Sequence, residues 1–206
     1  MINVAVSQRI DLISDRNETR DSIDQRLIVF LNYAGFQPIT VPNKIIESNK
    51  KDHRKDALIS WINKLEICGV VLSGGNDPYQ WPARDDTESW LLDHAEKFKL
   101  PVLGICRGMQ MLALREGISL CRVDGHIKTV HKIEGKITGE VNSFHKLALS
   151  CIPETYNSLA RSEDGCIEAI RHKNLPWEGW MWHPERFSNF RELDLERIRS
   201  LFKRKL

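Results

Sequence analysis

Residues 100–112 read Leu100-Pro101-Val102-Leu103-Gly104-Ile105-Cys106-Arg107-Gly108-Met109-Gln110-Met111-Leu112. A short apolar run ends at Ile105, and a helical pattern begins directly after Cys106. Glycines two places before and two places after this cysteine predict the sharp strand-to-helix turn that presents a nucleophile at a sheet edge. Free backbone N–H groups and the positive helix end would then favour the thiolate. The alternative is a structural cysteine, buried on a strand beside two incidental glycines.

Strand and helix patterns alternate through the first half of the chain. Besides the strand before Cys106, strands are predicted at 3–8, 37–41 and 68–72, helices at 21–34, 56–65 and 86–99, and a polar loop at 9–20. This alternation predicts an α/β fold with a mostly parallel central sheet and helices on both faces. From residue 118 to about 170, short runs between Gly, Asn, Ser and Asp indicate a small antiparallel β portion. One domain over 1–206 is predicted, with a final helix at 194–203.

The bulk composition is that of an ordinary globular enzyme. The chain is 41% hydrophobic and 28% charged, with a formal net charge of +2, which gives no reason to expect nucleic acid as a partner. No apolar run approaches the length of a membrane span, and no secretory signal precedes the first strand. Five widely spaced cysteines without a Cys-x-x-Cys pair argue against a disulfide framework. We therefore expect a cytoplasmic protein that does not bind membranes.

A thiol nucleophile needs a base and a group that orients the base. His183 is the candidate base because Glu185 follows two residues later, and positions i and i+2 share a face in extended chain. Taken alone, His-Pro-Glu is equally a surface turn. Cys121, His126 and His131 match no strong zinc spacing, so no metal site is predicted.

Acyl transfer also requires donors for the developing oxyanion. The N–H group of Arg107 is one candidate, since it directly follows the nucleophile. The bare backbone of Gly74-Gly75, after a buried strand, is the second. A plain tight turn is the alternative there, and neither a Gly-x-Gly-x-x-Gly nor a Walker lysine pattern supports phosphate binding.

Five motifs in order carry a family resemblance: Gly74-Gly75-Asn76-Asp77-Pro78, Gly104-Ile105-Cys106-Arg107-Gly108-Met109-Gln110, Val141-Asn142-Ser143-Phe144-His145, Asp164-Gly165-Cys166-Ile167-Glu168-Ala169-Ile170 and Trp182-His183-Pro184-Glu185. The chain resembles the class I glutamine amidotransferase-like superfamily, in particular its γ-glutamyl hydrolase branch. The resemblance implies a catalytic triad of Cys106, His183 and Glu185, and an oxyanion hole from Gly75 and Arg107. It also implies that the γ-glutamyl head group is bound by Gln110, Ser143, Phe144, His145 and Lys146. No metal or organic cofactor is implied.

The resemblance implies hydrolysis of a small γ-glutamyl conjugate through a thioester on Cys106. Three departures from the branch pattern leave the leaving amine open: Lys146-Leu147 for His-Gln, Met181 for Gln, and Gly117-Ile118-Ser119-Leu120 for Gly-Gly-Thr-Leu. Because Lys146 could meet an anionic leaving group, γ-glutamyl-CDP-amidate of capsule phosphoramidate synthesis is one candidate. The alternatives are a glutaminase subunit that supplies ammonia to a separate synthetase and a non-catalytic binding module on this fold. A homo-oligomer also stays open.

Overall fold

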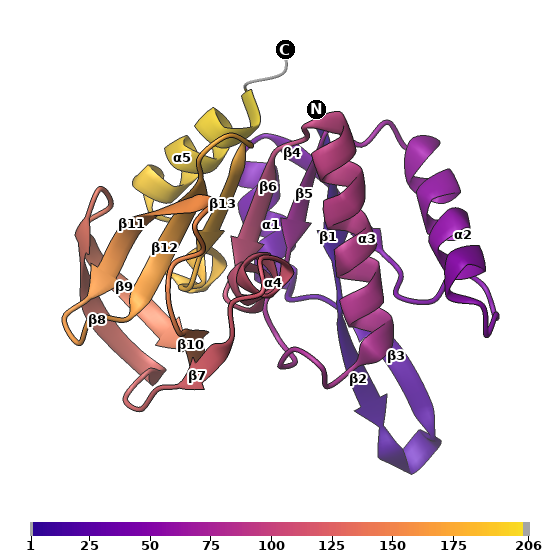
Figure 1. Cartoon of the computed structure of the whole chain (residues 1–206), viewed down its shortest axis with the longest axis horizontal. Helices are drawn as coiled ribbons and strands as arrows, with labels where there is room; N and C mark the ends of the chain where they lie inside the picture. Colours follow the sequence, from indigo (N-terminus) through magenta and orange to yellow (C-terminus); the bar gives the residue numbers. More distant parts are fainter. Residues whose placement is uncertain (1, 204–206) are drawn as a thin grey trace.

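The computed structural model, which describes residues 2–203, is built on a nine-stranded sheet (Figure 1). Its strand order is β4-β1-β5-β6-β13-β12-β11-β8-β9. The bounds are β4 Phe36–Val41, β1 Ile2–Ser7, β5 Gly69–Leu72, β6 Val102–Ile105, β13 Trp177–Trp180, β12 Ile167–His172, β11 Tyr156–Ser162, β8 Ile127–Gly135 and β9 Gly139–Phe144. The first five strands in this order pair in parallel, and the remaining pairs are antiparallel. The α/β fold with a parallel core and an antiparallel portion is therefore confirmed.

Helices cover both faces of the parallel half. On one face lie α3 (Pro82–Phe98) and α4 (Arg107–Arg115), with α2 (Lys51–Asn63) packed outside α3. On the other face lie α1 (Gln25–Tyr33) and α5 (Glu192–Phe202), which are joined by a hydrogen bond from the Arg199 guanidinium to the carbonyl of Tyr33 (Figure 1). The strands β5, β6 and β13 are buried throughout, as expected for a sheet covered on both sides.

The antiparallel strands extend the same sheet. Two short strands, β7 (Leu120–Arg122) and β10 (Leu147–Leu149), pair separately beside them. Strand β13 is the junction of the two halves, since it pairs in parallel with β6 on one side and antiparallel with β12 on the other. The residues that follow β13 therefore lie at the boundary between the two halves.

The predicted polar loop at 9–20 is wrong. Those residues form a hairpin of β2 (Arg9–Ile13) and β3 (Glu18–Ser22), joined by the 3-10 turn η1 (Ser14–Arg16). Most of its side chains are exposed on both faces, so the sequence lacks the alternation of apolar and polar residues that marks a half-buried strand. The hairpin is tied to the body by Asn76, whose amide exchanges hydrogen bonds with the backbone of Ile10 at 2.8 and 2.9 Å.

Several helix boundaries also differ from the prediction. Asp24, rather than Asp21 or Ser22, caps α1 by accepting from the N–H of Arg26 at 2.9 Å. The helices α2 and α3 begin at Lys51 and Pro82, several residues before their predicted starts. Their first turns are charged or mostly exposed and carry no apolar periodicity.

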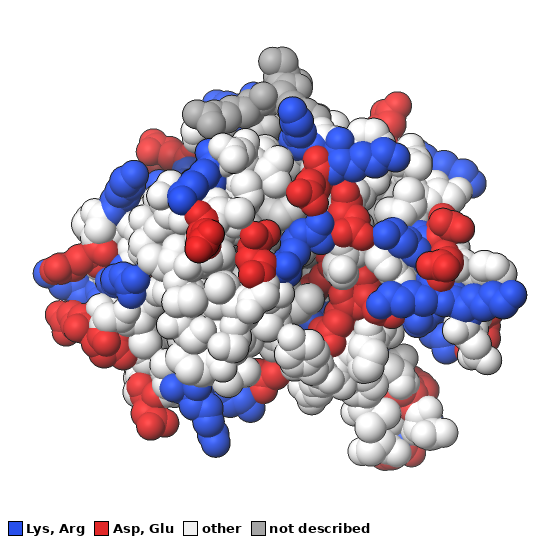
Figure 2. Space-filling model, in the orientation of Figure 1, with Lys and Arg blue, Asp and Glu red and all other residues white. Residues whose placement is uncertain are grey.

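Charges of both signs are interspersed on the face shown in Figure 2. None of the helices within residues 2–203 combines the length and apolar character that a membrane crossing requires.

Candidate active site

Cys106 stands at a strained turn between β6 and α4. Its backbone angles are φ 50° and ψ −103°, in a region that residues other than glycine rarely adopt. A Cβ atom at Gly104 would lie 2.5 Å from the carbonyl carbon of Gly108, and one at Gly108 would collide with the carbonyl of Leu72. The two glycines therefore let the helix start against the strands, and the strand-to-helix turn predicted around Cys106 is present.

Three neighbouring strands bring the candidate residues together. The parallel strands β5, β6 and β13 end at the same sheet edge, and they are followed by Gly74-Gly75, Cys106 and His183. The N–H group of Cys106 donates to the carbonyl of Trp180 at 2.7 Å, which fixes the nucleophile beside the end of β13. This is the edge at which open α/β sheets bind their ligands.

His183 and Glu185 form a buried pair. Nδ1 of His183 donates to Oε1 of Glu185 at 2.7 Å, and each residue is only 2% exposed. Burial disfavours the imidazolium, but hydrogen bonds and charge from Cys106 and Glu185 outweigh it and raise the pKa of His183 to about 9. The arrangement thus stabilises a positively charged imidazole next to the sulfur.

The pair does not use the extended backbone assumed from the sequence. The strand β13 ends at Trp180, and Pro184–Arg186 is a single 3-10 turn, η2, closed by the N–H of Arg186 on the carbonyl of His183. The guanidinium of Arg26 on α1 holds this turn by donating to the carbonyl of Glu185 at 2.7 Å. The carboxylate reaches the imidazole because the chain turns, so the predicted strand end at Trp180–Glu185 is wrong beyond Trp180.

Asn142 is a buried residue whose role the sequence did not indicate. Its side-chain amide donates to the carbonyl of His183 at 2.8 Å, and its carbonyl oxygen accepts from the N–H of His183 at 3.0 Å. Both backbone groups of His183 are therefore fixed by one side chain from β9. The ring of Phe144, also on β9, meets the imidazole edge-on at 5.7 Å between centroids.

The two predicted oxyanion donors flank the nucleophile. Arg107 is the first residue of α4, where helix N–H groups have no partner within the helix. Gly75 has φ +103°, a conformation that suits glycine. A Cβ at the neighbouring Gly74 would lie 2.5 Å from Cε1 of His183. The glycine loop therefore packs directly against the imidazole.

A buried ion network supports this loop. Glu88 of α3 is fully buried and accepts from Ser7 Oγ and Arg84 Nε, each at 2.9 Å, and from the Arg107 guanidinium. The other end of Arg84 donates to the carbonyls of Ser73 and Gly74 at 2.7 and 2.9 Å. One carboxylate thus connects the glycine loop to the start of α4.

A cavity of about 410 Å³ opens in front of Cys106 and His183. Among the predicted substrate residues, Gln110, Phe144, His145 and Lys146 line it. Ser143 is not among the lining residues, since its fully buried hydroxyl donates to the carbonyl of His126 at 2.8 Å. Arg9 and Arg186 line the cavity as well, and neither was predicted. Arg9 was missed because its hairpin carries no strand pattern in the sequence.

The polar groups around the cavity are partly engaged. Nε2 of Gln110 donates to the carbonyl of Leu147 at 2.8 Å, and Lys146 pairs with Asp77 at 2.8 Å while about half exposed. The guanidinium of Arg186 lies over the ring of Phe144 at 4.6 Å. With Arg9, these residues give the cavity three cationic side chains against one carboxylate, that of Asp77.

The family described as glutamine amidotransferase class-I matches residues 18–197. The chain belongs to the class I glutamine amidotransferase family. Among curated relatives of this amidotransferase, a γ-glutamyl-CDP-amidate hydrolase from Campylobacter jejuni subsp. jejuni serotype O:2 is 33% identical over 135 residues, covering 63% of this chain and 68% of that protein. The glutamine-hydrolysing subunit of a GMP synthase from Methanocaldococcus jannaschii is 31% identical over 169 residues, covering 75% and 78%.

Solved structures agree with the fold of the amidotransferase. A protein from Thermoplasma acidophilum superposes with a TM-score of 0.68 at 20% identity, covering 98% of this chain and 92% of that one. A glutamine amidotransferase from Thermotoga maritima gives a TM-score of 0.62 at 17% identity, covering 89% and 76%. At these identities the likeness shows the shared fold.

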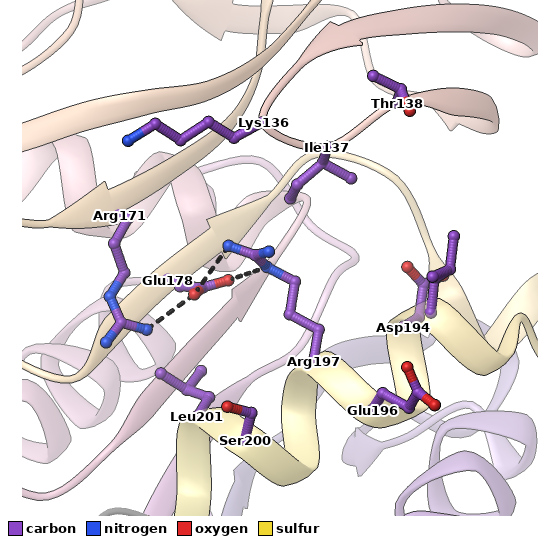
Figure 3. Close-up of a pocket in the computed structure, with 11 residues that line it drawn as sticks. Lys136, Ile137, Thr138, Arg171, Glu178, Asp194, Glu196, Arg197, Ser200 and Leu201 are labelled. Atoms are coloured by element: carbon purple, nitrogen blue, oxygen red, sulfur yellow. Dashed lines mark hydrogen bonds and ion pairs between the residues drawn. The ribbon is translucent and has the colours of Figure 1, made fainter.

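A larger cavity of about 660 Å³ lies elsewhere on the amidotransferase, between α5 and the sheet (Figure 3). Its carboxylate, Glu178, is bound by Arg171 at 2.7 Å and by Arg197 at 2.7 and 3.2 Å. Because the acid is neutralised by two guanidinium groups and no cysteine lines the cavity, this hollow lacks the groups needed for nucleophilic catalysis.

Proposed function

We propose that the protein hydrolyses the γ-glutamyl amide bond of a small conjugate and releases glutamate and an amine. The observation that carries this proposal is the cysteine at a strained strand-to-helix turn beside a buried His183–Glu185 pair. A thiol, a base and a group that orients the base are the parts that nucleophilic acyl transfer requires. Family membership adds that the acyl group is a γ-glutamyl unit.

Cys106 attacks the γ-carbonyl as His183 takes or holds the thiol proton. The N–H groups of Gly75 and Arg107 stabilise the tetrahedral oxyanion. The C–N bond then breaks, and the imidazolium of His183 protonates the leaving amine, which gives a γ-glutamyl thioester. Water, deprotonated by His183, adds to the thioester, and glutamate leaves as the sulfur regains its proton. Glu185 holds the imidazole in one tautomer throughout.

The charges around the cavity favour an anionic leaving group. Three cationic side chains, Arg9, Lys146 and Arg186, line the space in front of the sulfur. A phosphoramidate or nucleotide amine would be attracted by such a site, whereas ammonia from glutamine would gain nothing from it. The relative from Campylobacter jejuni acts on γ-glutamyl-CDP-amidate by its name, which makes this conjugate the first substrate to test.

The second candidate function is a glutaminase subunit that delivers ammonia to a separate synthetase. It is favoured by the relatives that are glutamine-hydrolysing subunits of GMP synthases, one of which covers 75% of this chain at 31% identity. In that case glutamine is the substrate, and release of glutamate increases when the synthetase binds.

The deciding experiment measures glutamate release from glutamine, γ-glutamyl-GABA, γ-glutamyl dipeptides and γ-glutamyl-CDP-amidate. The wild type is compared with Cys106→Ala and with Cys151→Ala, the same substitution at an exposed cysteine outside the cavity. We expect rapid release from one conjugate, lost in Cys106→Ala and kept in Cys151→Ala. Release from glutamine alone supports the glutaminase subunit. Release that survives in Cys106→Ala would contradict both candidates.

A further inference from the structure

A cluster of histidines and acids lies beside the active site, on the antiparallel half of the sheet. Its members are His126, directly before β8, His131 on β8, His145, directly after β9, and Glu168 on β12. Oε1 of Glu168 lies 3.5 Å from Nδ1 of His126 and 3.4 Å from Nε2 of both His131 and His145. Three ring nitrogens therefore surround one carboxylate oxygen.

Glu168 is the observation that requires an occupant. Its side chain is fully buried, yet neither carboxylate oxygen has a hydrogen-bond partner among residues 2–203. The ring nitrogen Nε2 of His131 that faces it is also buried without a partner in that range. A buried carboxylate without compensation is strongly unfavourable, so a group of positive charge is expected between these atoms.

The second ring nitrogens show where the lone pairs point. Nε2 of His126 lies 2.8 Å from a carboxylate oxygen of Asp164, and Nδ1 of His145 lies 3.2 Å from the carbonyl of Leu147. Since both partners only accept, these two nitrogens carry the protons of the neutral rings. The lone pairs then lie on Nδ1 of His126 and Nε2 of His145, which face each other at 3.1 Å. Histidines that bind metals are held in this way, through the opposite N–H group.

We propose that His126, His131, His145 and Glu168 form a binding site for a divalent transition-metal ion, with Zn²⁺ as the best fit. Donor atoms at about 2.0–2.2 Å from a tetrahedral zinc ion lie about 3.4 Å apart, as do the atoms measured here. Imidazole ligands select zinc and its transition-metal neighbours over Mg²⁺ and Ca²⁺. With neutral imidazoles, Glu168 and Asp164 together leave two negative charges, which a divalent ion neutralises.

The spacing of these residues in the chain gave no zinc motif, because each donor comes from a different part of the sheet. The ion would join β8, the loop after β9 and β12 to one another. Since Asn142 and Phe144 of β9 contact His183, the site would stiffen one wall of the active-site cavity. It is a structural site at the edge of the cavity and has no part in the chemical step.

Metal binding is measured on the full chain carrying Cys106→Ala, because the active-site thiol and His183 would themselves bind zinc. The protein is stripped with a chelator and titrated with Zn²⁺ and, separately, with Co²⁺, whose visible absorption reports tetrahedral nitrogen–oxygen ligation. We expect one equivalent of metal and a higher melting temperature on binding. His131→Ala, at a half-buried position, should bind at least about tenfold more weakly.

Two variants serve as controls. His53→Ala removes an exposed imidazole from α2, and Cys166→Ser tests the neighbouring group of His126, Asp164 and Cys166, whose donor atoms also lie close together. Both should bind as the parent does. The proposal is overturned if the stripped protein binds no equivalent of metal, which would leave a proton shared among the imidazoles. It is also overturned if binding survives His131→Ala, or if Cys166→Ser alone abolishes it.

Discussion

Replacing Glu88 with glutamine removes the carboxylate that Arg84 and Arg107 share inside the protein. Glu88 is fully buried, and it compensates two guanidinium groups that are themselves almost fully buried. Removing one partner of a buried ion pair leaves the other charge uncompensated, at a cost of about 3–5 kcal/mol. Since Asp85 still pairs with Arg107, we expect a loss near the lower value, about 3 kcal/mol.

Urea denaturation measures this loss. With an m value of about 2–3 kcal/mol per molar urea, the midpoint should fall by about 1–1.5 M. The matched control is Glu96→Gln, the same substitution on the same helix at a side chain that is half exposed and paired with Arg115. That variant should lose less than about 1 kcal/mol. An equal effect of the two substitutions, or a loss below about 1 kcal/mol in Glu88→Gln, would refute the reasoning.

The pH dependence provides a second test of the same pair. Burial opposes ionisation of Glu88, but the charges of Arg107 and Arg84 outweigh it and lower the pKa of the carboxyl group. A lowered carboxyl pKa contributes stability that is present above the ordinary value of 4.5 and is lost as the pH falls below it. The difference in unfolding free energy between wild type and Glu88→Gln should therefore shrink in acid. A difference that stays constant from pH 7 to pH 3 would contradict the assignment.

Three further predictions concern single residues. Glu185→Gln removes the carboxylate that helps to raise the pKa of His183 to about 9, so the alkaline limb of the kcat/KM profile should move down by at least about one pH unit. Gly74→Ala places a Cβ 2.5 Å from Cε1 of His183 and should lower kcat/KM for glutamate release about 100-fold while circular dichroism stays unchanged. Burial raises the pKa of Asp194 to about 6 despite Arg191, so this group stabilises the fold below pH 3.8 and loses that contribution as the pH rises through 6. Asp194→Asn should therefore be up to about 3 kcal/mol more stable than wild type in urea at pH 8 and equal to it near pH 4.

The features that the sequence predicted are those written in a few adjacent residues. The turn at Cys106 depends on two glycines and an apolar run within nine positions, and no distant contact is needed to recognise it. The start of α3 was within reach in the same way, because Pro82 occupies the first helical position, where proline is common. Its fixed backbone angle was a stronger signal than the apolar pattern that begins a turn later.

The features that the sequence did not predict depend on contacts between distant segments. The hairpin β2–β3 is mostly exposed, and Asn76 fixes it from a position 66 residues away. Glu88 looks like an ordinary residue of a helix until Arg107, which lies beside the nucleophile, is brought against it. His126, His131 and Glu168 likewise have no regular spacing, because a curved sheet rather than one helix or loop aligns them. Single-chain patterns carry no information on such contacts.

The edge strand β9 links the two halves of the molecule. Three strands separate β9 from β13 in the sheet order, yet Asn142 hydrogen-bonds both backbone groups of His183. Strand twist accumulates across a wide sheet, so its far edge can fold back over the carboxyl ends of the parallel strands. The antiparallel half therefore supplies one wall of the active site, through Asn142, Phe144 and Lys146. The residues of β9 and the loop after it both position the base and meet the leaving group, so differences in substrate among relatives of this fold are expected to arise there rather than at the triad.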